Sequence, residues 1–234
     1  MSEFKEISSF RSFNGYQKIF THYSHQLKSA HEFSVYLPPK ALIGQRCPVF
    51  YWLSGAASDE REFMLKSGFQ KYASEQNMIV VVPEPSPGPP TNTNKEISAK
   101  YFSQFGFYLD ATEPPFKENF RMYSYVMEEL LPLVDYKFPT LPDKRGIAGH
   151  SMGGMGALVL GLRNTEIFKS MSCMAAISNP SEMPIGVQLQ KMYFGTNQEE
   201  AEKYDPTVLV RNYEGPHRHI LFDQVRSLLI LWSI

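Results

Sequence analysis

The amino-acid sequence predicts one α/β domain in which a mostly parallel sheet carries helices on both faces. Apolar runs that suit buried strands alternate with helical patterns, which is the order typical of parallel strands joined by crossover helices. No low-complexity segment divides the 234 residues, and this length is enough for one large core. We therefore predict a domain over residues 1–224, followed by a divergent apolar tail over residues 225–234.

The predicted elements follow one another along this domain. Period-two alternation or continuous apolar runs predict strands at residues 32–37, 48–53, 78–82, 144–148, 171–177 and 219–222. Helical spacing or composition predicts helices at residues 59–76, 119–134, 155–160 and around 206–210. Residues 83–100, rich in Pro, Asn and Thr, predict a long surface loop.

Composition narrows the functional classes. The chain is 43% hydrophobic and 20% charged, with a formal net charge of −1, which argues against disorder and against attraction to nucleic acid or to an anionic membrane. We find no signal-peptide pattern and no apolar run of membrane-spanning length. Cys47 and Cys173 are too few and too far apart for a disulfide framework or a zinc site, and we expect buried thiols. A cytoplasmic protein with a small-molecule substrate is predicted, and the sequence leaves a homodimer open.

A G-x-S-x-G motif at residues 149–153 centres on Ser151. It lies between a predicted strand and a predicted helix, where glycines are needed because side chains would collide at the sharp bend. We interpret Ser151 as a hydrolase nucleophile; the alternative is a glycine-rich turn with an ordinary serine. The amide of Met152, at the start of the helix, is one expected oxyanion donor, and the amide of Ala56, in a small-residue turn, is the other.

Seven separate blocks carry a family resemblance. They are YLPPK at 36–40, YWLSG at 51–55, KSG at 66–68, GFYLDAT at 106–112, RMYSYV at 121–126, GHSMGG at 149–154 and ISNP at 177–180. In these blocks the sequence resembles the S-formylglutathione hydrolase, or esterase D, family of α/β-hydrolases. The resemblance implies a cytosolic thioesterase that hydrolyses S-formylglutathione to glutathione and formate in formaldehyde detoxification, with carboxylesterase side activity and no cofactor or metal. It also assigns Ser151, Ala56 and Met152 to the roles given above.

The sequence leaves the family pattern after residue 224. The family continues with a glycine, an acidic loop that supplies the triad aspartate and a later His-Ser pair that supplies the base, whereas this chain has VRSLLILWSI. We therefore expect that the triad acid and base are absent, that the last strand and helix of the α/β-hydrolase fold are missing, and that the chain is nearly inactive. The alternative is a non-catalytic binding or regulatory isoform, or a gene-model fragment.

Substitute triad residues are few, because the order in this fold is nucleophile, acid, histidine. Asp205 followed by His219 satisfies the order, but His219 is expected at the entry of a strand whose far end faces the site; His217 is the other histidine after the serine. His150, beside the nucleophile, is expected to point away from it. Asp223 stands near the family's acid position, two or three residues early.

A second departure concerns the predicted pocket. Glu84 stands where relatives have an aspartate, and residues 100–105 replace a tryptophan and a glycine-rich turn. Because these positions flank the pocket, the sequence leaves the glutathione specificity implied by the resemblance open.

Overall fold

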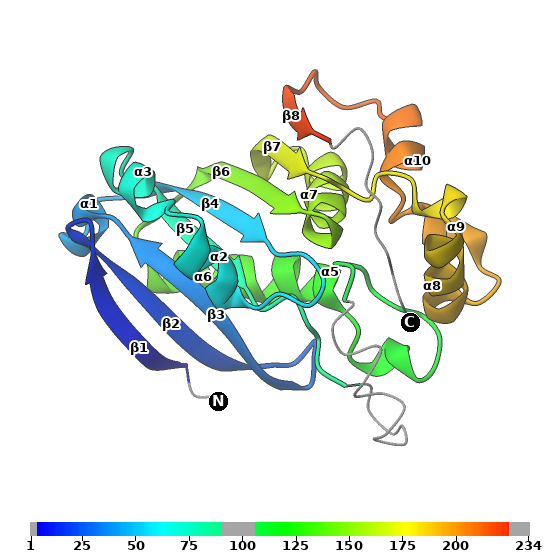
Figure 1. Ribbon diagram of the computed structural model, residues 1–234, viewed down its shortest axis with the longest axis horizontal. Coiled ribbons are helices and arrows are strands. Elements are labelled where there is room, and N and C mark those ends of the chain that lie inside the picture. Colours follow the sequence, from blue (N-terminus) through cyan, green and yellow to red (C-terminus); the bar gives the residue numbers. More distant parts are fainter. Residues whose placement is uncertain (1–3, 90–105, 225–234) are drawn as a thin grey trace.

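An eight-stranded sheet runs through the described residues, 4–89 and 106–224, of the computed structural model (Figure 1). The strands are β1 (Lys5–Ser12), β2 (Gly15–Ser24), β3 (Ser29–Leu37), β4 (Cys47–Leu53), β5 (Ile79–Pro83), β6 (Thr140–His150), β7 (Phe168–Met174) and β8 (Ile220–Asp223). Their spatial order is β1-β2-β3-β5-β4-β6-β7-β8. The pairs from β1 to β5 are antiparallel, and those from β5 through β4, β6 and β7 to β8 are parallel. The predicted fold class, a mostly parallel sheet with helices, is confirmed.

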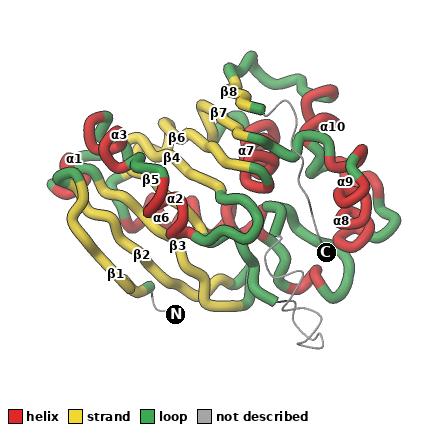
Figure 2. Tube along the Cα trace, viewed as in Figure 1, coloured by secondary structure: helices red, strands yellow, loops and turns green. Residues whose placement is uncertain are grey.

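The helices lie in the segments that connect the strands and pack outside the sheet (Figure 2). They are α1 (Pro39–Leu42), α2 (Glu60–Lys66), α3 (Gln70–Glu75), α5 (Met122–Ser124), α6 (Leu131–Lys137), α7 (Met152–Arg163), α8 (Pro184–Phe194), α9 (Gln198–Glu202) and α10 (Pro206–Arg211). Short 3₁₀ turns occupy η1 (Phe116–Glu118) and η3 (Pro180–Glu182), and η2 (Tyr125–Leu130) is π-helical. No helix within residues 4–89 and 106–224 is both long and apolar enough to cross a membrane.

Alternation along the central strands places helices on both faces. Trp52 of β4 stacks on Phe63 of α2, with ring centroids 4.0 Å apart. Its neighbour Tyr51 points the other way and is paired in register with Ile147 of β6, whose side chain lies against Gly161 of α7. The sheet is therefore covered by α2 on one face and by α7 on the other.

Strand β4 corrects one detail of the prediction. Its continuous apolar run predicts a strand buried on both faces, but Phe50 and Trp52 are only half-buried, whereas Val49 and Tyr51 are fully buried. The α7 face is thus the main core, and the α2 face carries a smaller aromatic cluster.

The predicted helix at residues 59–76 is two helices. α2 ends at Lys66, and Gly68 has a φ of +69° before α3 begins at Gln70. A left-handed glycine ends a helix, because its neighbours can no longer continue the i to i−4 hydrogen bonds. Asp59 starts α2, since its carboxylate accepts the amides of Arg61 and Glu62 at 2.9 and 2.8 Å.

The predicted helix at residues 119–134 exists but begins at Met122 and continues to Lys137. Its middle, η2, is π-helical and leads directly into Leu131 and Pro132. Proline has no amide to donate to the preceding turn, and a widened turn is one way to accommodate it. Tyr125, Val126, Leu130 and Val134 are fully buried, so the interpretation of this helix as a core element is confirmed.

The remaining predicted elements coincide with β3, β5, β6, β7, β8, α7 and α10, within a few residues at each end. No element was predicted before residue 32, and both β1 and β2 were missed. β1 is polar and largely exposed and gives no apolar period, and β2 buries the polar side chains of Gln17, His22 and Ser24. β8 is an edge strand of the described sheet and exposes Leu221 and Phe222. The predicted tail, residues 225–234, and residues 90–105 of the predicted loop lie outside the described residues.

Two buried histidines lie between the antiparallel strands and η2. His22 is within 3.1 Å of the Tyr125 hydroxyl, and His31 is within 3.0 Å of the Glu84 carbonyl oxygen. Burial lowers the pKa of both, that of His31 to about 4. Both rings are therefore neutral in the native state, in a site where a charge would be poorly solvated.

We expect acid to destabilise the protein through His31. Its folded pKa of about 4 lies below the unfolded value of 6.5, so its contribution is complete above pH 6.5 and is lost as pH falls toward 4, by about 3 kcal/mol in total. His31→Gln keeps a hydrogen-bond donor but does not titrate. Between pH 7 and pH 4.5, its Tm should fall by less than the Tm of the native chain. His25→Gln, at an exposed histidine, is the control. Parallel pH profiles for the native chain and His31→Gln would contradict the prediction.

Candidate active site

The serine of the G-x-S-x-G motif occupies a strained turn between β6 and α7. Ser151 has φ +56° and ψ −118°, a conformation that costs a non-glycine residue of the order of 1–3 kcal/mol. Neighbouring main chain holds it there: the Ser151 amide donates to Met174 at 2.9 Å, and its carbonyl accepts from Met155 at 3.1 Å and Ile177 at 3.4 Å. The predicted strand-turn-helix setting of this serine is confirmed.

Both flanking glycines are required by the close approach of β4. A Cβ added at Gly149 would lie 2.7 Å from the carbonyl oxygen of Leu53, and one added at Gly153 would lie 1.9 Å from it. The end of β4 thus passes against the turn, and only glycine leaves room for it.

That close approach brings the loop after β4 beside the serine. A Cβ added at Gly55 would lie 3.3 Å from the Cβ of Ser151. Gly55 is followed by the half-buried Ala56, so the turn predicted to hold the second donor lies beside Ser151. Met152 opens the twelve-residue α7, where the first amides have no partner within the helix and the helix dipole favours an anion. The structure brings Ser151, Ala56 and Met152 into one place.

Tyr108 supports this loop and was not singled out by sequence reasoning. It is fully buried, its hydroxyl donates to the carbonyl of Ser54 at 3.1 Å, and its ring lies against Gly156 of α7. A tyrosine in an apolar block is usually core, and only the fold shows that its hydroxyl reaches a chain segment 54 residues away. The left-handed φ of Tyr108, +51°, points to a specialised turn.

Replacing Tyr108 by phenylalanine is expected to loosen the loop. The buried carbonyl of Ser54 would lose its donor, at a cost of about 1–2 kcal/mol, and modification of Ser151 by a fluorophosphonate should slow about tenfold as the loop shifts. Tyr123→Phe is the matched control, because its hydroxyl is bonded to Asn164 at the far end of α7. Equal labelling rates for the two variants would refute a role for Tyr108 at the loop.

The six histidines of the chain are all described. His22 and His31 are buried beside η2, and His25 lies in the turn after β2. His150 ends β6 and is exposed, and its Nδ1 lies 3.4 Å from a Cβ added at Gly55. His217 and His219 are exposed before β8, their rings 4.9 Å apart. Because β6, β7 and β8 are parallel, His219, which precedes β8, lies at the opposite end of the strands from Ser151, which follows β6. Among the described hydrogen bonds, none joins a histidine to the Ser151 hydroxyl.

The two aspartates weighed as triad acids are in different situations. Asp205 is fully buried, and its carboxylate caps α10 through the amides of Thr207 and Val208 and also accepts from Ser181. It is therefore occupied in holding two segments together, and the structure does not bring it to Ser151. Asp223 ends β8, and its carbonyl accepts the Ala175 amide at 2.7 Å. Its main chain therefore lies at the carboxyl ends of the parallel strands, as Ser151 does.

Comparison with known proteins identifies the family. The Esterase family model matches residues 24–226. A Bos taurus protein named S-formylglutathione hydrolase is 46% identical over 220 residues, which are 94% of this chain and 78% of that one. A Rattus norvegicus protein of the same name is 43% identical over 222 residues, 95% and 78% of the two chains. This chain belongs to the S-formylglutathione hydrolase family of esterases.

The solved structure of an S-formylglutathione hydrolase from Agrobacterium tumefaciens has the same fold. It superposes with a TM-score of 0.86 at 38% identity, over 93% of this chain and 79% of that one. The resemblance predicted from seven sequence blocks is confirmed, as is the assignment of the chain to the hydrolases.

The two cysteine thiols are poorly suited to act as nucleophiles. Cys47 and Cys173 are both free and buried, as predicted, and burial raises the pKa of each thiol, that of Cys173 to about 11. A thiol with a raised pKa is a poor nucleophile, because the thiolate is the reactive form.

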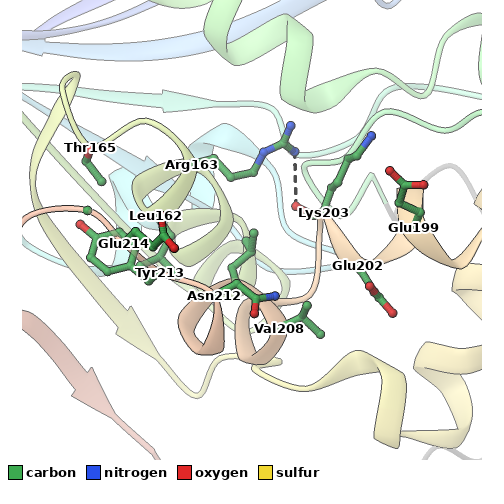
Figure 3. Close-up of a pocket in the computed structure, with 12 residues that line it drawn as sticks. Leu162, Arg163, Thr165, Glu199, Glu202, Lys203, Val208, Asn212, Tyr213 and Glu214 are labelled. Atoms are coloured by element: carbon green, nitrogen blue, oxygen red, sulfur yellow. Dashed lines mark hydrogen bonds between the residues drawn. The ribbon is translucent and has the colours of Figure 1, made fainter.

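Two surface cavities lie at a distance from the motif. One, of about 410 Å³, lies between the end of α7 and α10 (Figure 3), and one of about 550 Å³ lies among α8, α9 and α10. In the first, Arg163 packs against the rings of Tyr123 and Tyr204 and donates to the Lys203 carbonyl at 3.3 Å, while the Lys203 ammonium pairs with Glu200. Both of these cations therefore already have partners within the protein.

Proposed function

We propose that the chain is a serine hydrolase of thioesters and simple carboxylic esters, S-formylglutathione among them, with Ser151 as nucleophile. The observation that carries the proposal is the juxtaposition of a strained serine, the loop of Ala56 and the first amide of α7. Two backbone donors beside the serine suit the oxyanion that forms when an acyl carbon is attacked. The names of the relatives supply the substrate class.

The reaction follows from this arrangement. The Ser151 oxygen attacks the thioester carbonyl carbon, and the amides of Ala56 and Met152 stabilise the oxyanion. Collapse breaks the carbon–sulfur bond, releases glutathione and leaves a formyl ester on the serine. Water then attacks that ester and releases formate. The serine and the backbone supply the nucleophile and the electrophilic donors, so the proposal needs no metal or organic cofactor.

We further propose that the 234-residue chain turns over slowly. None of its six histidines is hydrogen-bonded to Ser151 among the described contacts, so the proton of the hydroxyl passes to solvent. Loss of a triad base lowers kcat by several orders of magnitude, although the oxyanion donors and substrate binding retain about 10³–10⁴-fold over water. Acylation by activated esters should survive better than turnover of natural substrates.

The proposed substrate is a small molecule met in the cytoplasm. Two free buried cysteines suit a reducing compartment, and a net charge of −1 gives no general attraction to nucleic acid or membrane. A homodimer is compatible with these properties.

Acylation of the serine tests the proposal directly. The purified chain is mixed with p-nitrophenyl acetate or S-formylglutathione, release of nitrophenolate or glutathione is followed, and intact and peptide mass spectra locate the acyl group. We expect an acyl ester on Ser151, followed by slow turnover. Acylation elsewhere, or none with either substrate, would overturn the proposed nucleophile. Fast turnover with acylation at Ser151 would overturn only the proposed slowness.

A further inference from the structure

Strand β8 lies at one end of the sheet and carries exposed apolar side chains (Figure 1). Leu221 is 60% exposed and Phe222 is 49% exposed. The strand pairs with β7 on one side, and no strand of the described residues pairs with its other side. An edge that combines open main-chain groups with apolar side chains is a template for pairing with another chain.

The main chain of β8 has its open side at Ile220 and Phe222. The carbonyl of Asp223 accepts the amide of Ala175, the residue after β7, so Asp223 turns its main-chain groups toward β7. Because this direction alternates along a strand, Leu221 also turns toward β7, whereas Ile220 and Phe222 direct their amides and carbonyls away from the sheet. These two residues have the spacing at which an antiparallel neighbour forms its hydrogen-bonded pairs.

The side chains of this segment alternate between the two faces of the sheet. Ile220 packs against the main core. His219, Leu221 and Asp223 therefore share the opposite face, and all three are exposed. The rings of His217 and His219 are 4.9 Å apart, which fits two residues on one face of an extended chain. One face of the edge thus presents an imidazole, a leucine and a carboxylate in that order.

This order complements itself when two β8 strands run antiparallel. A two-fold axis perpendicular to the sheet joins each face of one copy to the same face of the other. With Leu221 opposite Leu221 of the second copy, Ile220 stands opposite Phe222, and His219 stands opposite Asp223. Apolar side chains then face one another, and an imidazole faces a carboxylate on both sides of the axis. A shift by one step in either direction places Leu221 opposite His219 or Asp223 and loses the match.

We propose that β8 is a dimerisation edge, through which two copies of this chain join their sheets in antiparallel register about Leu221. The main chains of Ile220 and Phe222 exchange hydrogen bonds, and the His219 imidazole donates to the Asp223 carboxylate of the second copy. A four-residue strand contributes less than the roughly 1,600 Å² of a standard interface, so the dimer is weak and depends on concentration. The inference does not depend on catalysis by Ser151.

Analytical ultracentrifugation of the full chain tests the dimer between about 1 and 200 μM, the range in which a weak interface dissociates. We expect the average mass to rise with concentration from the 26.8 kDa of one chain toward that of two. His219→Asp sets two carboxylates opposite each other and should weaken the dimer about tenfold. Adding Asp223→His to the same chain exchanges the two groups and should restore the native affinity. His25→Asp makes the same change at an exposed histidine after β2 and should leave the dimer unchanged.

A cysteine at position 221 tests the register. Opposed residues of a non-hydrogen-bonded antiparallel pair have Cα atoms about 4.5 Å apart, which a disulfide can span. Mild oxidation should therefore join two Leu221→Cys chains through residue 221, and peptide mass spectrometry locates the bond. Leu65→Cys, at a similarly exposed leucine of α2, is the matched control and should form no such dimer. The two native cysteines are buried.

The other outcomes overturn the inference in different ways. A native chain that stays monomeric throughout the concentration range shows that β8 does not pair with a second copy; protection of the Leu221→Cys thiol from maleimide would then show that the edge is covered within one chain. A dimer that His219→Asp leaves intact, or that forms no bond through residue 221, uses another surface. Growth beyond two chains shows an open contact without a two-fold axis. Labelling of Ser151 tests the proposed function separately from all of these results.

Discussion

Replacing Ser151 by alanine is expected to reduce fluorophosphonate labelling of the chain by at least about 10³-fold. Labelling needs a nucleophilic oxygen beside donors that stabilise a developing anion, and Ser151 is the serine that the turn between β6 and α7 presents to the Ala56 loop. Alanine and serine are equally strained at a φ of +56°, so Ser151→Ala should change Tm little. A gel-based labelling time course together with thermal unfolding measures both effects.

The matched control is Ser178→Ala. Ser178 lies one residue beyond Ile177, which bonds to the Ser151 carbonyl, and its own carbonyl accepts the Thr207 amide. Ser178→Ala removes a serine hydroxyl that also lies beyond the carboxyl ends of the parallel strands. The fluorophosphonate should label this variant at the native rate. Labelling that persists in Ser151→Ala would show that another residue is the nucleophile.

Replacing Gly153 by alanine is expected to destabilise the fold and to disrupt the site together. The new Cβ would lie 1.9 Å from the carbonyl oxygen of Leu53, so β4 and α7 must separate. Such overpacking costs about 3 kcal/mol, which outweighs the gain of roughly 1 kcal/mol from alanine's helix propensity. The net loss predicts a fall in Tm of roughly 4–8 °C and a large fall in labelling of Ser151.

Gly44→Ala provides the comparison for Gly153. Gly44 has a φ of +78° and nothing within 4 Å of an added Cβ, so alanine there meets strain but no clash and should cost only about 1 kcal/mol. Chemical denaturation of the two variants gives the difference between their free energies of unfolding, with the m-value checked for two-state behaviour. If Gly153→Ala were as stable as Gly44→Ala, the close approach of β4 to the turn would be refuted.

Much of the fold could be predicted from local patterns. Strands β3, β5 and β8 and helices α7 and α10 follow from apolar spacing and from turn residues that act within a few positions. The break between α2 and α3 was missed because Gly68 acts through its backbone conformation, which the apolar pattern does not report. β1 was missed because an exposed edge strand has no buried face to produce a period.

The sequence by itself determined the serine turn, because the G-x-S-x-G motif and the strand and helix on either side of it lie within a few positions of one another. It also determined the family, since matching blocks are spread along the chain. Only the tertiary structure decided what surrounds that turn: the hydroxyl of Tyr108 on Ser54 and the carbonyl of Leu53 against Gly153. These pairs are far apart in sequence, and they meet because of the strand order and the face to which each side chain points, which no local pattern encodes.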